Sequence, residues 1–176
     1  KKQYIFANNA VNKALHFNSP DKSFRIMNRM RFIYNSISKE KVALQLKERF
    51  KGRKLIFCGS TKQTEVLSQY TYHTKTSDKN LKLFQEGLIN ELAMVKKGGV
   101  GTTYKNVDSV IIVQADSDKS GITSQKIGRI LLHQPGKIAE IYIICLMGTQ
   151  DEDWVNQSLS NFDERKVKFI KSEKIC

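Results

Sequence analysis

Short, continuously apolar segments that alternate with amphipathic ones most restrict how this sequence can fold. The runs Leu55–Cys58, Val110–Val113 and Ile141–Leu146 are each followed by polar or glycine-containing residues. Apolar runs of this length, without polar alternation, are typical of strands that are buried on both faces. Strands that alternate with helices through short loops form a parallel sheet covered on both sides. The sequence therefore predicts an α/β domain with a mainly parallel sheet.

The periodicity of the apolar residues positions the expected elements along the chain. We expect strands near residues 54–58, 70–73, 91–95, 108–114 and 139–146, and a final strand at 166–170. Helices are expected at residues 24–34, 38–50, 61–68, 77–87 and 122–132, and from about residue 151 onward. Ser38 and Ser77 are candidate N-caps, and Thr149 with Glu152 forms a candidate capping box. The α/β domain thus begins with a helical N-terminal lead-in.

Residues 1–22 are polar and mixed, and are interrupted by Asn8-Asn9 and Ser19-Pro20. Such breakers are typical of connecting segments. We therefore interpret residues 1–22 as a linker or arm from a preceding domain and residues 23–176 as the domain itself. Because the first residue is Lys rather than Met, we also expect the chain to be a fragment or a processed piece of a longer product.

The charge balance favours a polyanionic partner. The formal net charge is +13, from 30 Lys and Arg against 17 Asp and Glu. An excess of this size is typical of proteins that bind nucleic acid through phosphate contacts and counterion release. The alternative is a lysine-rich, well-solvated surface. No apolar run approaches the roughly 20 residues that a membrane span needs, so we expect no membrane partner.

Cysteine and histidine positions give no sign of a metal site or a disulfide framework. Cys58, Cys145 and Cys176 share no ligand-like spacing, and their number is odd. Cys58 and Cys145 lie inside apolar runs and are expected to be small buried residues of a reduced, cytoplasmic protein. The three histidines are too scattered to hold a metal ion, and we expect none to be bound by this chain.

Two segments look like nucleotide or metal sites but lack a required residue. The glycine-rich stretch Lys97–Thr103 has Thr102 where a phosphate loop needs its lysine, and a strand rather than a helix is expected after it. This argues against a self-contained phosphate-loop enzyme, including a partition-type ATPase. The acids Asp151–Asp153 follow Thr149 and are better explained as the first turn of a helix, where the helix dipole favours them.

Four segments occur in an order that is known from one protein family. RKLIFCGS (Arg53–Ser60) resembles motif IV, and TYHTKTSDKNLKLFQEG (Thr71–Gly87) resembles the strand and helix that follow it. GGVGTTYKNVDSVIIV (Gly98–Val113) resembles motif V, and SQKIGRILL (Ser124–Leu132) resembles motif VI. Together they resemble the carboxy-terminal RecA-like domain of a superfamily two helicase, with phage helicases of the UvsW type as the nearest likeness.

This resemblance implies a RecA-like, three-layer α/β/α fold and half of an ATP site. In such helicases, ATP with magnesium lies between two RecA-like domains, and the first domain supplies the phosphate loop and the magnesium-binding acids. Neither occurs in these 176 residues. The resemblance therefore implies an N-terminal RecA-like partner domain, in the same or another chain. It also implies an ATP-dependent helicase of phage recombination or repair, in the host cytoplasm, with DNA as its partner and RNA as the alternative.

The residues that match the family motifs are assigned roles by the resemblance. Arg129 would face the phosphates, and Gln125 would set the motif VI helix against the nucleotide or the motif V loop. Gly128 would let the helix approach a neighbour or ligand closely. Gly101 and Thr103 match the motif V positions near the nucleotide, with Thr103 in place of the usual acid. Ser60, Thr102 and Lys105 would contact the nucleic-acid backbone, although turn formation or simple solvation explains these three equally well.

Helical spacing gives an independent expectation for motif VI. Gln125, Arg129 and Leu132 share one face of a helix, whereas Ile127, Ile130 and Leu131 project from the opposite side and are expected to pack on the sheet. Leu132 stands where the family has a second arginine. This departure keeps open an alternative function, a catalytically inactive helicase-like module that only binds nucleic acid.

Overall fold

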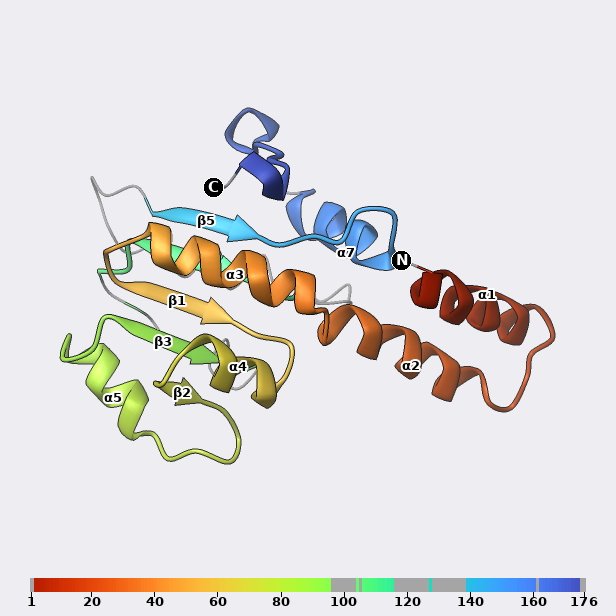
Figure 1. The fold of residues 1–176 in the computed structure, drawn as a ribbon, viewed down its shortest axis with the longest axis horizontal. Helices are drawn as coiled ribbons and strands as arrows, with labels where there is room; N and C mark the ends of the chain where they lie inside the picture. Colours follow the sequence, from red (N-terminus) through yellow and green to blue (C-terminus); the bar gives the residue numbers. More distant parts are fainter. Residues whose placement is uncertain are drawn as a thin grey trace. The chain divides into compact units, whose positions relative to one another are not determined.

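The computed structural model describes residues 2–95, 104, 106–115, 127, 139–160 and 162–174 (Figure 1). Helices α3, α4, α5 and α7 comprise Ile37–Arg49, Thr61–Leu67, Lys79–Gln85 and Gln150–Leu159, and α1 and α2 comprise Lys2–His16 and Lys22–Tyr34. The chain divides into two compact units, Lys1–Ser36 and Ile37–Cys176. We refer to them as the helical hairpin and the α/β unit, and we describe each by itself.

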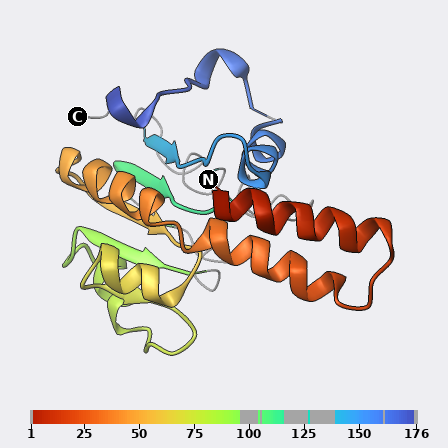
Figure 2. The same cartoon turned by 45° about the vertical axis from the view of Figure 1, so that its right-hand side comes forward.

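The helical hairpin consists of α1 and α2, which lie side by side and are joined by a short turn (Figures 1 and 2). In the turn, Asn18 has a φ of 46° and the amide of Ser19 donates to the carbonyl of Ala14 at 2.8 Å. Val11, Ala14 and Ile33 are the buried apolar residues. Arg29 Nη1 donates to Asn8 Oδ1 at 2.9 Å and links the two helices.

The hairpin refines what the sequence predicted for the N-terminal region. The helix expected at residues 24–34 is confirmed as α2. Helix α1, within the segment interpreted as a linker or arm, was not expected from its polar composition. Its buried stripe contains only Val11 and Ala14, too narrow to give a clear helical pattern. The interpretation of residues 1–22 as an arm of a preceding domain stays a prediction.

The α/β unit is built on a parallel sheet of five strands within the described residues. The strands are β1 Lys54–Phe57, β2 Thr71–Tyr72, β3 Glu91–Met94, β4 Ser109–Ile112 and β5 Glu140–Ile143. They lie in the order β2-β3-β1-β4-β5, and each neighbouring pair is parallel. The five strands match those expected up to residue 146. The expected α/β class with a parallel sheet is therefore confirmed.

The central strands are buried on both faces, as their uninterrupted apolar sequences predict. Leu55 of β1 pairs in register with Leu92 and Val110, and the next residue of β1, Ile56, pairs with its counterparts on the same two strands. All residues of β1 and β4 are buried. Successive residues point to opposite faces, so both faces of these strands need a covering layer.

Each face of the sheet has its own core cluster. On one face, residues of α3 and α4 pack on alternate strand residues; this cluster comprises Ala43, Leu46, Ile56, Cys58, Leu67, Ala93, Ile111, Val113 and Ile144. On the other face, Phe84 of α5 packs with Tyr104 and Ile127 on the remaining strand residues, which include Leu55, Leu92 and Val110. The three-layer α/β/α arrangement is thus confirmed.

Helix ends and the C-terminal segment show where the sequence prediction was wrong. Helix α3 begins at Ile37, so Ser38 lies inside it, and α5 follows Asp78 rather than Ser77. The expected strand at 166–170 is absent from the described residues: the short helix η2, Glu164–Lys166, is followed by residues without a strand, and η3 spans Ser172–Lys174. Phe169 and Ile170 remain exposed there, so their apolar character does not reflect a buried strand.

The helix expected at residues 122–132 lies outside the described residues except for Ile127. Ile127 is helical and only 4% exposed, and it belongs to the core cluster on the α5 face. This agrees with the orientation expected for this residue in the motif VI helix.

Candidate functional site at the carboxyl edge of the sheet

The parallel sheet brings the carboxyl ends of its strands to one edge. In open α/β sheets, ligands bind in the crevice outside these ends. The chain leaves β1 towards Ser60, leaves β3 into the motif V-like segment and leaves β4 into the motif VI-like segment. All three motif-like segments therefore follow strands that end at the same edge, which makes this edge the candidate functional site.

The loop after β1 is held by reciprocal hydrogen bonds with α4. Ser60 is the N-cap of α4, and its hydroxyl accepts a hydrogen bond from the amide of Gln63 at 3.3 Å. The buried Gln63 side chain in turn accepts from the amide of Gly59 at 2.9 Å through Oε1. Ser60 therefore has a structural role as a helix cap. Its expected contact with nucleic acid stays a prediction.

The motif V-like segment is described only where it approaches β4. Tyr104 is 3% exposed; its hydroxyl lies 3.4 Å from Met94 Sδ and its ring centroid lies 6.3 Å from that of Phe84. Asn106 has a φ of 58°, a left-handed conformation that asparagine tolerates better than most residues. Tyr104 thus fixes the middle of this segment in the core beside β3, a role that the sequence analysis did not assign.

Most of the predicted site residues lie outside the described part of the chain. They are Gly101, Thr102, Thr103, Lys105, Gln125, Gly128 and Arg129. Their predicted roles in binding ATP and nucleic acid therefore stay predictions. The described residues on either side of them, Tyr104 and Ile127, are both buried in the core cluster on the α5 face.

A buried ion pair lies beyond the ends of β4 and β5. Lys39 Nζ of α3 is 2.6 Å from Asp151 Oδ2 of α7, and both side chains are completely buried. The same ammonium donates to the carbonyl of Val113 at 2.9 Å and to Gln114 Oε1 at 3.1 Å. Burial disfavours the charged ammonium and lowers the pKa of Lys39, against the attraction of the Asp151 carboxylate.

The carboxylate of this pair is also satisfied by hydrogen bonds. Gln114 Nε2 donates to Asp151 Oδ1 at 3.3 Å, and the amide of Leu146 donates to Asp151 Oδ2 at 2.8 Å. The Lys39–Asp151–Gln114 cluster therefore joins α3, the segments after β4 and β5, and the start of α7. Sequence analysis placed Asp151 correctly in a first helical turn but did not find its partner, which is more than a hundred positions away.

Thr149 caps the start of α7 as expected, but the amides that bond to Thr149 and Glu152 are not those of a regular capping box. Thr149 is the N-cap, and its hydroxyl accepts from the amide of Asp151 at 3.2 Å. The Glu152 carboxylate accepts from the amide of Gly148 at 2.8 Å, one residue before the position that a regular capping box uses.

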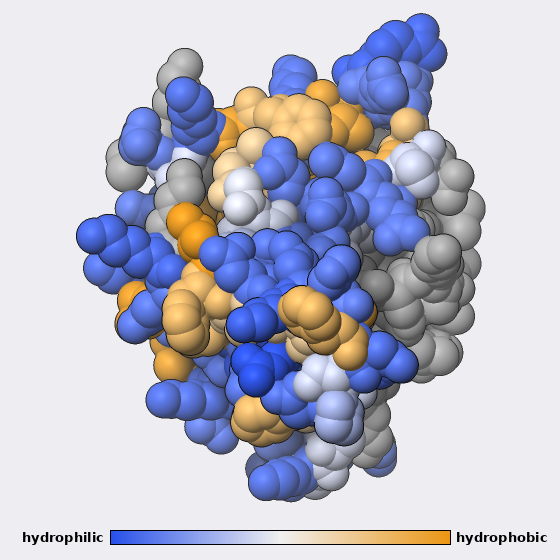
Figure 3. Space-filling view, turned by 90° about the vertical axis from the view of Figure 1, so that its right-hand side faces the viewer, coloured by the Kyte–Doolittle hydropathy of each residue, from blue (hydrophilic) through white to orange (hydrophobic). Residues whose placement is uncertain are grey.

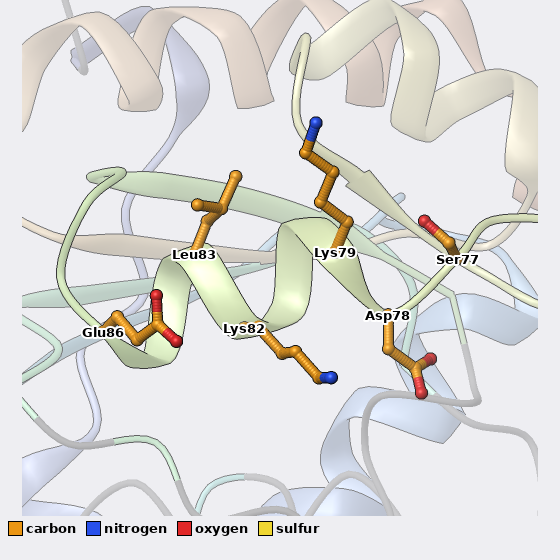
Figure 4. Close-up of a pocket in the computed structure, with 6 residues that line it drawn as sticks. All are labelled: Ser77, Asp78, Lys79, Lys82, Leu83 and Glu86. Carbon is orange, nitrogen blue, oxygen red and sulfur yellow. The ribbon is translucent and has the colours of Figure 1, made fainter.

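A surface hollow lies beside α5. It measures about 460 Å³ and is lined by the α5 region, namely Ser77, Asp78, Lys79, Lys82, Leu83 and Glu86. Figure 4 shows Lys79 and Leu83 projecting to one side of α5 and Lys82 to the other. The described lining mixes acids and bases, and it does not include Ser60, the one predicted site residue that the structure describes, so we assign no ligand to the hollow.

Cysteines and other potential ligands provide no metal site in the described part of the chain. Within it, no group of three or more His, Cys, Asp and Glu side chains is arranged so that it could hold a metal ion. Cys58 and Cys145 are free thiols; burial raises the pKa of Cys58, and raises that of Cys145 to about 11. Cys58 is buried as expected, whereas Cys145 is only partly buried.

No described helix is long and apolar enough to cross a membrane.

Solved structures provide a comparison for this geometry. A variant of Dbp5 from S. cerevisiae bound to RNA and ADP BeF3 aligns with a TM-score of 0.62 and 17% identity, over 81% of this chain and 41% of that one. The C-terminal domain of the DEAD-box protein Dbp5 gives 0.60 and 17%, over 74% and 82% of the respective chains. The C-terminal part of the Fun30 ATPase domain gives 0.52 and 15%, over 78% and 49%.

These similarities show the fold. The chain has the RecA-like fold of helicase and ATPase C-terminal domains, as expected from its sequence motifs. It spans about two fifths of the length of the RNA-bound Dbp5 chain. No protein-family model and no curated protein matches the sequence.

Proposed function

We propose that this chain is the second motor domain of an ATP-dependent nucleic-acid helicase or translocase. The observation that carries the proposal is the position of the motif-like segments on a RecA-like fold. The motif IV-like segment contains β1, the motif V-like segment joins β3 to β4, and the motif VI-like segment follows β4. The likeness to Dbp5, which was solved with RNA and ADP BeF3, supports a nucleic acid and a nucleotide as the ligands.

The ATP site of this motor is completed by an N-terminal RecA-like domain. That domain supplies the phosphate-loop lysine and the acids that hold magnesium. This chain supplies Arg129, which stabilises charge that develops on the phosphates, and Gln125, which orients the motif VI helix. Gly128 allows the helix to approach the nucleotide closely, and Gly101 and Thr103 line the nucleotide from motif V.

The nucleic-acid partner of the proposed motor is DNA. The net charge of +13 supports binding to phosphates, and the motif likeness to UvsW-type helicases favours DNA over RNA and a role in phage recombination or repair in the host cytoplasm. Ser60, Thr102 and Lys105 would contact the strand's backbone. Comparing DNA and RNA of the same sequence as stimulators of ATP hydrolysis tests this choice.

Replacing Arg129 with Ala in the native gene product that contains this chain tests the motor function. Loss of a phosphate-facing arginine should lower nucleic-acid-stimulated ATP hydrolysis by roughly 10³-fold. Arg165→Ala is the control, because Arg165 is highly exposed and its partner among the described residues is Asp163, two positions away. Unchanged hydrolysis in Arg129→Ala, or an equal loss in the control, would reject the assigned role.

A second function, a nucleic-acid-binding module without ATP turnover, is favoured by one observation. Leu132 occupies the position at which the family has its second motif VI arginine. In such a module, Arg129→Ala would remove at most one phosphate contact and slightly reduce the salt dependence of binding. A native product that binds nucleic acid but hydrolyses no ATP would therefore support the module and reject the motor.

A further inference from the structure

Exposed phenylalanines are concentrated in the helical hairpin. Phe6, Phe17, Phe24 and Phe32 are 79%, 68%, 61% and 45% exposed, and they are all of the phenylalanines between Lys1 and Ser36. Burying an aromatic ring is strongly favourable in water, so a small unit that exposes four of them has apolar surface available for a partner.

Nearly all the charged side chains of the hairpin are positive. Lys1–Ser36 contains seven Lys and Arg and a single acid, Asp21, whereas the remaining residues contain 23 and 16. Asp21 is itself paired with Arg25, at 2.7 Å. The hairpin is therefore far more basic per residue than the α/β unit, and a polyanion is the partner that complements it.

Aromatic and basic side chains share the outward faces of both helices. On α1, Lys2, Phe6 and Lys13 are separated by four and seven positions, lie on one helical face and are all exposed. On α2, Phe24 and Arg31 are seven positions apart and are also both exposed. Each of these two phenylalanines thus has a cation within two turns of the same face.

A hollow at the turn of the hairpin also combines an aromatic side chain with basic ones. It measures about 290 Å³ and is lined by Ala10, Lys13, Ala14, Phe17, Ser19 and Arg25. An exposed ring therefore borders the same hollow as two cationic side chains. Because Arg25 is paired with Asp21, a base stacked on the ring of Phe17 would leave its phosphate within the field of Lys13.

The distribution of these residues favours nucleic acid over a protein partner. Protein interfaces have contiguous apolar centres that are depleted in lysine. In the view of Figure 3, where the right-hand side of Figure 1 faces the viewer, apolar patches lie among hydrophilic residues. The hairpin also exposes Ile5, Leu15 and Met27, but its seven Lys and Arg lie among these apolar residues in the sequence. Single strands are bound by aromatic rings that stack on successive bases, together with cations that contact the phosphates.

We propose that the α1–α2 hairpin binds an unpaired nucleic-acid strand. Bases stack on Phe6, Phe17 and Phe24, while Lys13 and Arg31 contact the phosphates between them. This inference deepens the proposed function, from which it takes nucleic acid as the ligand, by assigning a second binding surface outside motifs IV to VI. It does not depend on ATP turnover.

Binding of a fluorescein-labelled oligothymidine of about 20 nucleotides and of a matched duplex, measured by fluorescence anisotropy, tests the proposal. The double variant Phe6→Ala/Phe24→Ala should weaken binding of the single strand by about tenfold or more, and weaken binding of the duplex much less. The variant Lys13→Glu/Arg31→Glu should lower the magnitude of the salt slope by roughly 1.4, for two phosphate contacts.

The matched control is Lys168→Glu/Phe169→Ala, because Phe169 is 77% exposed in the other unit and Lys168 is exposed next to it. This control should bind both ligands like the unaltered chain. Circular dichroism checks that the variants keep their helices, which is expected since all the altered side chains are exposed.

Three results would overturn the proposal. The first is single-strand binding that Phe6→Ala/Phe24→Ala leaves unchanged, and the second is an equal loss in the control. The third is a hairpin variant that changes the molar mass in light scattering but not nucleic-acid binding, which would identify a protein interface instead. Because ATP hydrolysis is not measured, failure here leaves the Arg129 test of the motor untouched, and the reverse also holds.

Discussion

The two units use the same residue types in opposite ways. Phe84 of the α/β unit is completely buried and its ring lies 4.5 Å from the Arg53 guanidinium carbon, whereas Phe6 of the hairpin is 79% exposed. Likewise, the Lys39–Asp151 pair is completely buried, whereas the Arg25–Asp21 pair is more than 40% exposed on both sides. Phe84 and Lys39 of the α/β unit help to hold one conformation, although its C-terminal segment also exposes Phe169 and Arg165. In the hairpin, by contrast, every phenylalanine is exposed.

The difference also concerns stability. The hairpin buries three aliphatic residues, whereas the α/β unit has an extensive core cluster on each face of its sheet. Units of fewer than about 40 residues rarely bury enough surface to be stable alone. Substitutions of one residue type in the two units should therefore have very different effects on unfolding, and such matched pairs test the comparison directly.

The largest expected effect is that of Phe84→Ala. Removing a fully buried ring leaves a cavity between α5 and the sheet, and should lower the free energy of unfolding by about 4 kcal/mol. Phe6→Ala removes an exposed ring and should change it by less than about 0.5 kcal/mol. Urea unfolding followed by circular dichroism measures both, and equal losses would refute the contrast.

The next effect is that of Lys39→Met. The buried Asp151 carboxylate then loses its cation, and the free energy of unfolding should fall by about 3 kcal/mol. Adding Asp151→Asn removes the unpaired charge and should recover part of the loss, because the amide oxygen can still accept from Leu146. Arg25→Met, in the exposed pair of the hairpin, should cause little measurable change. A small effect of Lys39→Met in the same urea titration would show that the pair is not essential to the α/β unit.

A smaller effect is expected for Gly52→Ala. A Cβ atom there would lie 2.4 Å from Asp108 Oδ2, which accepts from the amide of Arg53 at 2.7 Å. The clash should cost about 1–3 kcal/mol, since the carboxylate cannot move without breaking this bond. In the hairpin turn, Asn18 has a φ of 46°, so Asn18→Gly should be tolerated within about 0.5 kcal/mol. Thermal unfolding ranks the two, and the opposite order would contradict the prediction.

The smallest effect is that of Thr149→Ala. Loss of the hydroxyl that caps α7 should cost about 1 kcal/mol in urea unfolding. Thr149→Ser keeps the acceptor and serves as the control. In the hairpin, α2 follows Asp21 without a side-chain capping bond, so no comparable cap can be removed there. Equal stability of the Ala and Ser variants would show that the Thr149 cap does not stabilise α7.

The strands were predictable because their signal is local. Runs such as Val110–Val113 are uniformly apolar, and a strand buried on both faces needs that pattern. Helix starts were less predictable: Ser38 lies within α3 because the chain begins that helix at Ile37. Helix α1 gave no clear pattern because its phenylalanine and isoleucine side chains remain exposed instead of lining a buried face.

The candidate site was predictable as a position in the fold but not as a set of contacts. Motif order places the candidate site at the loops that follow β1, β3 and β4, and this position stays a prediction. The burial of Tyr104 and the Lys39–Asp151 pair depend on contacts between distant segments, which neither spacing nor composition encodes. A lysine flanked by Ser38 and Glu40 resembles any surface lysine until the carboxylate of α7 is placed beside it.

The Lys39–Asp151 pair also has a consequence for fragments of the chain and for folding during synthesis. A fragment must contain both residues if the buried lysine is to have its counter-ion. Lys39 emerges from the ribosome more than a hundred residues before its carboxylate partner, Asp151. Until then, burying the lysine leaves a charge without a counter-ion, which should keep α3 from settling on the sheet. Truncations that stop before α7 should therefore accumulate as loosely packed, aggregation-prone chains, and expression boundaries that retain Leu159 should avoid this.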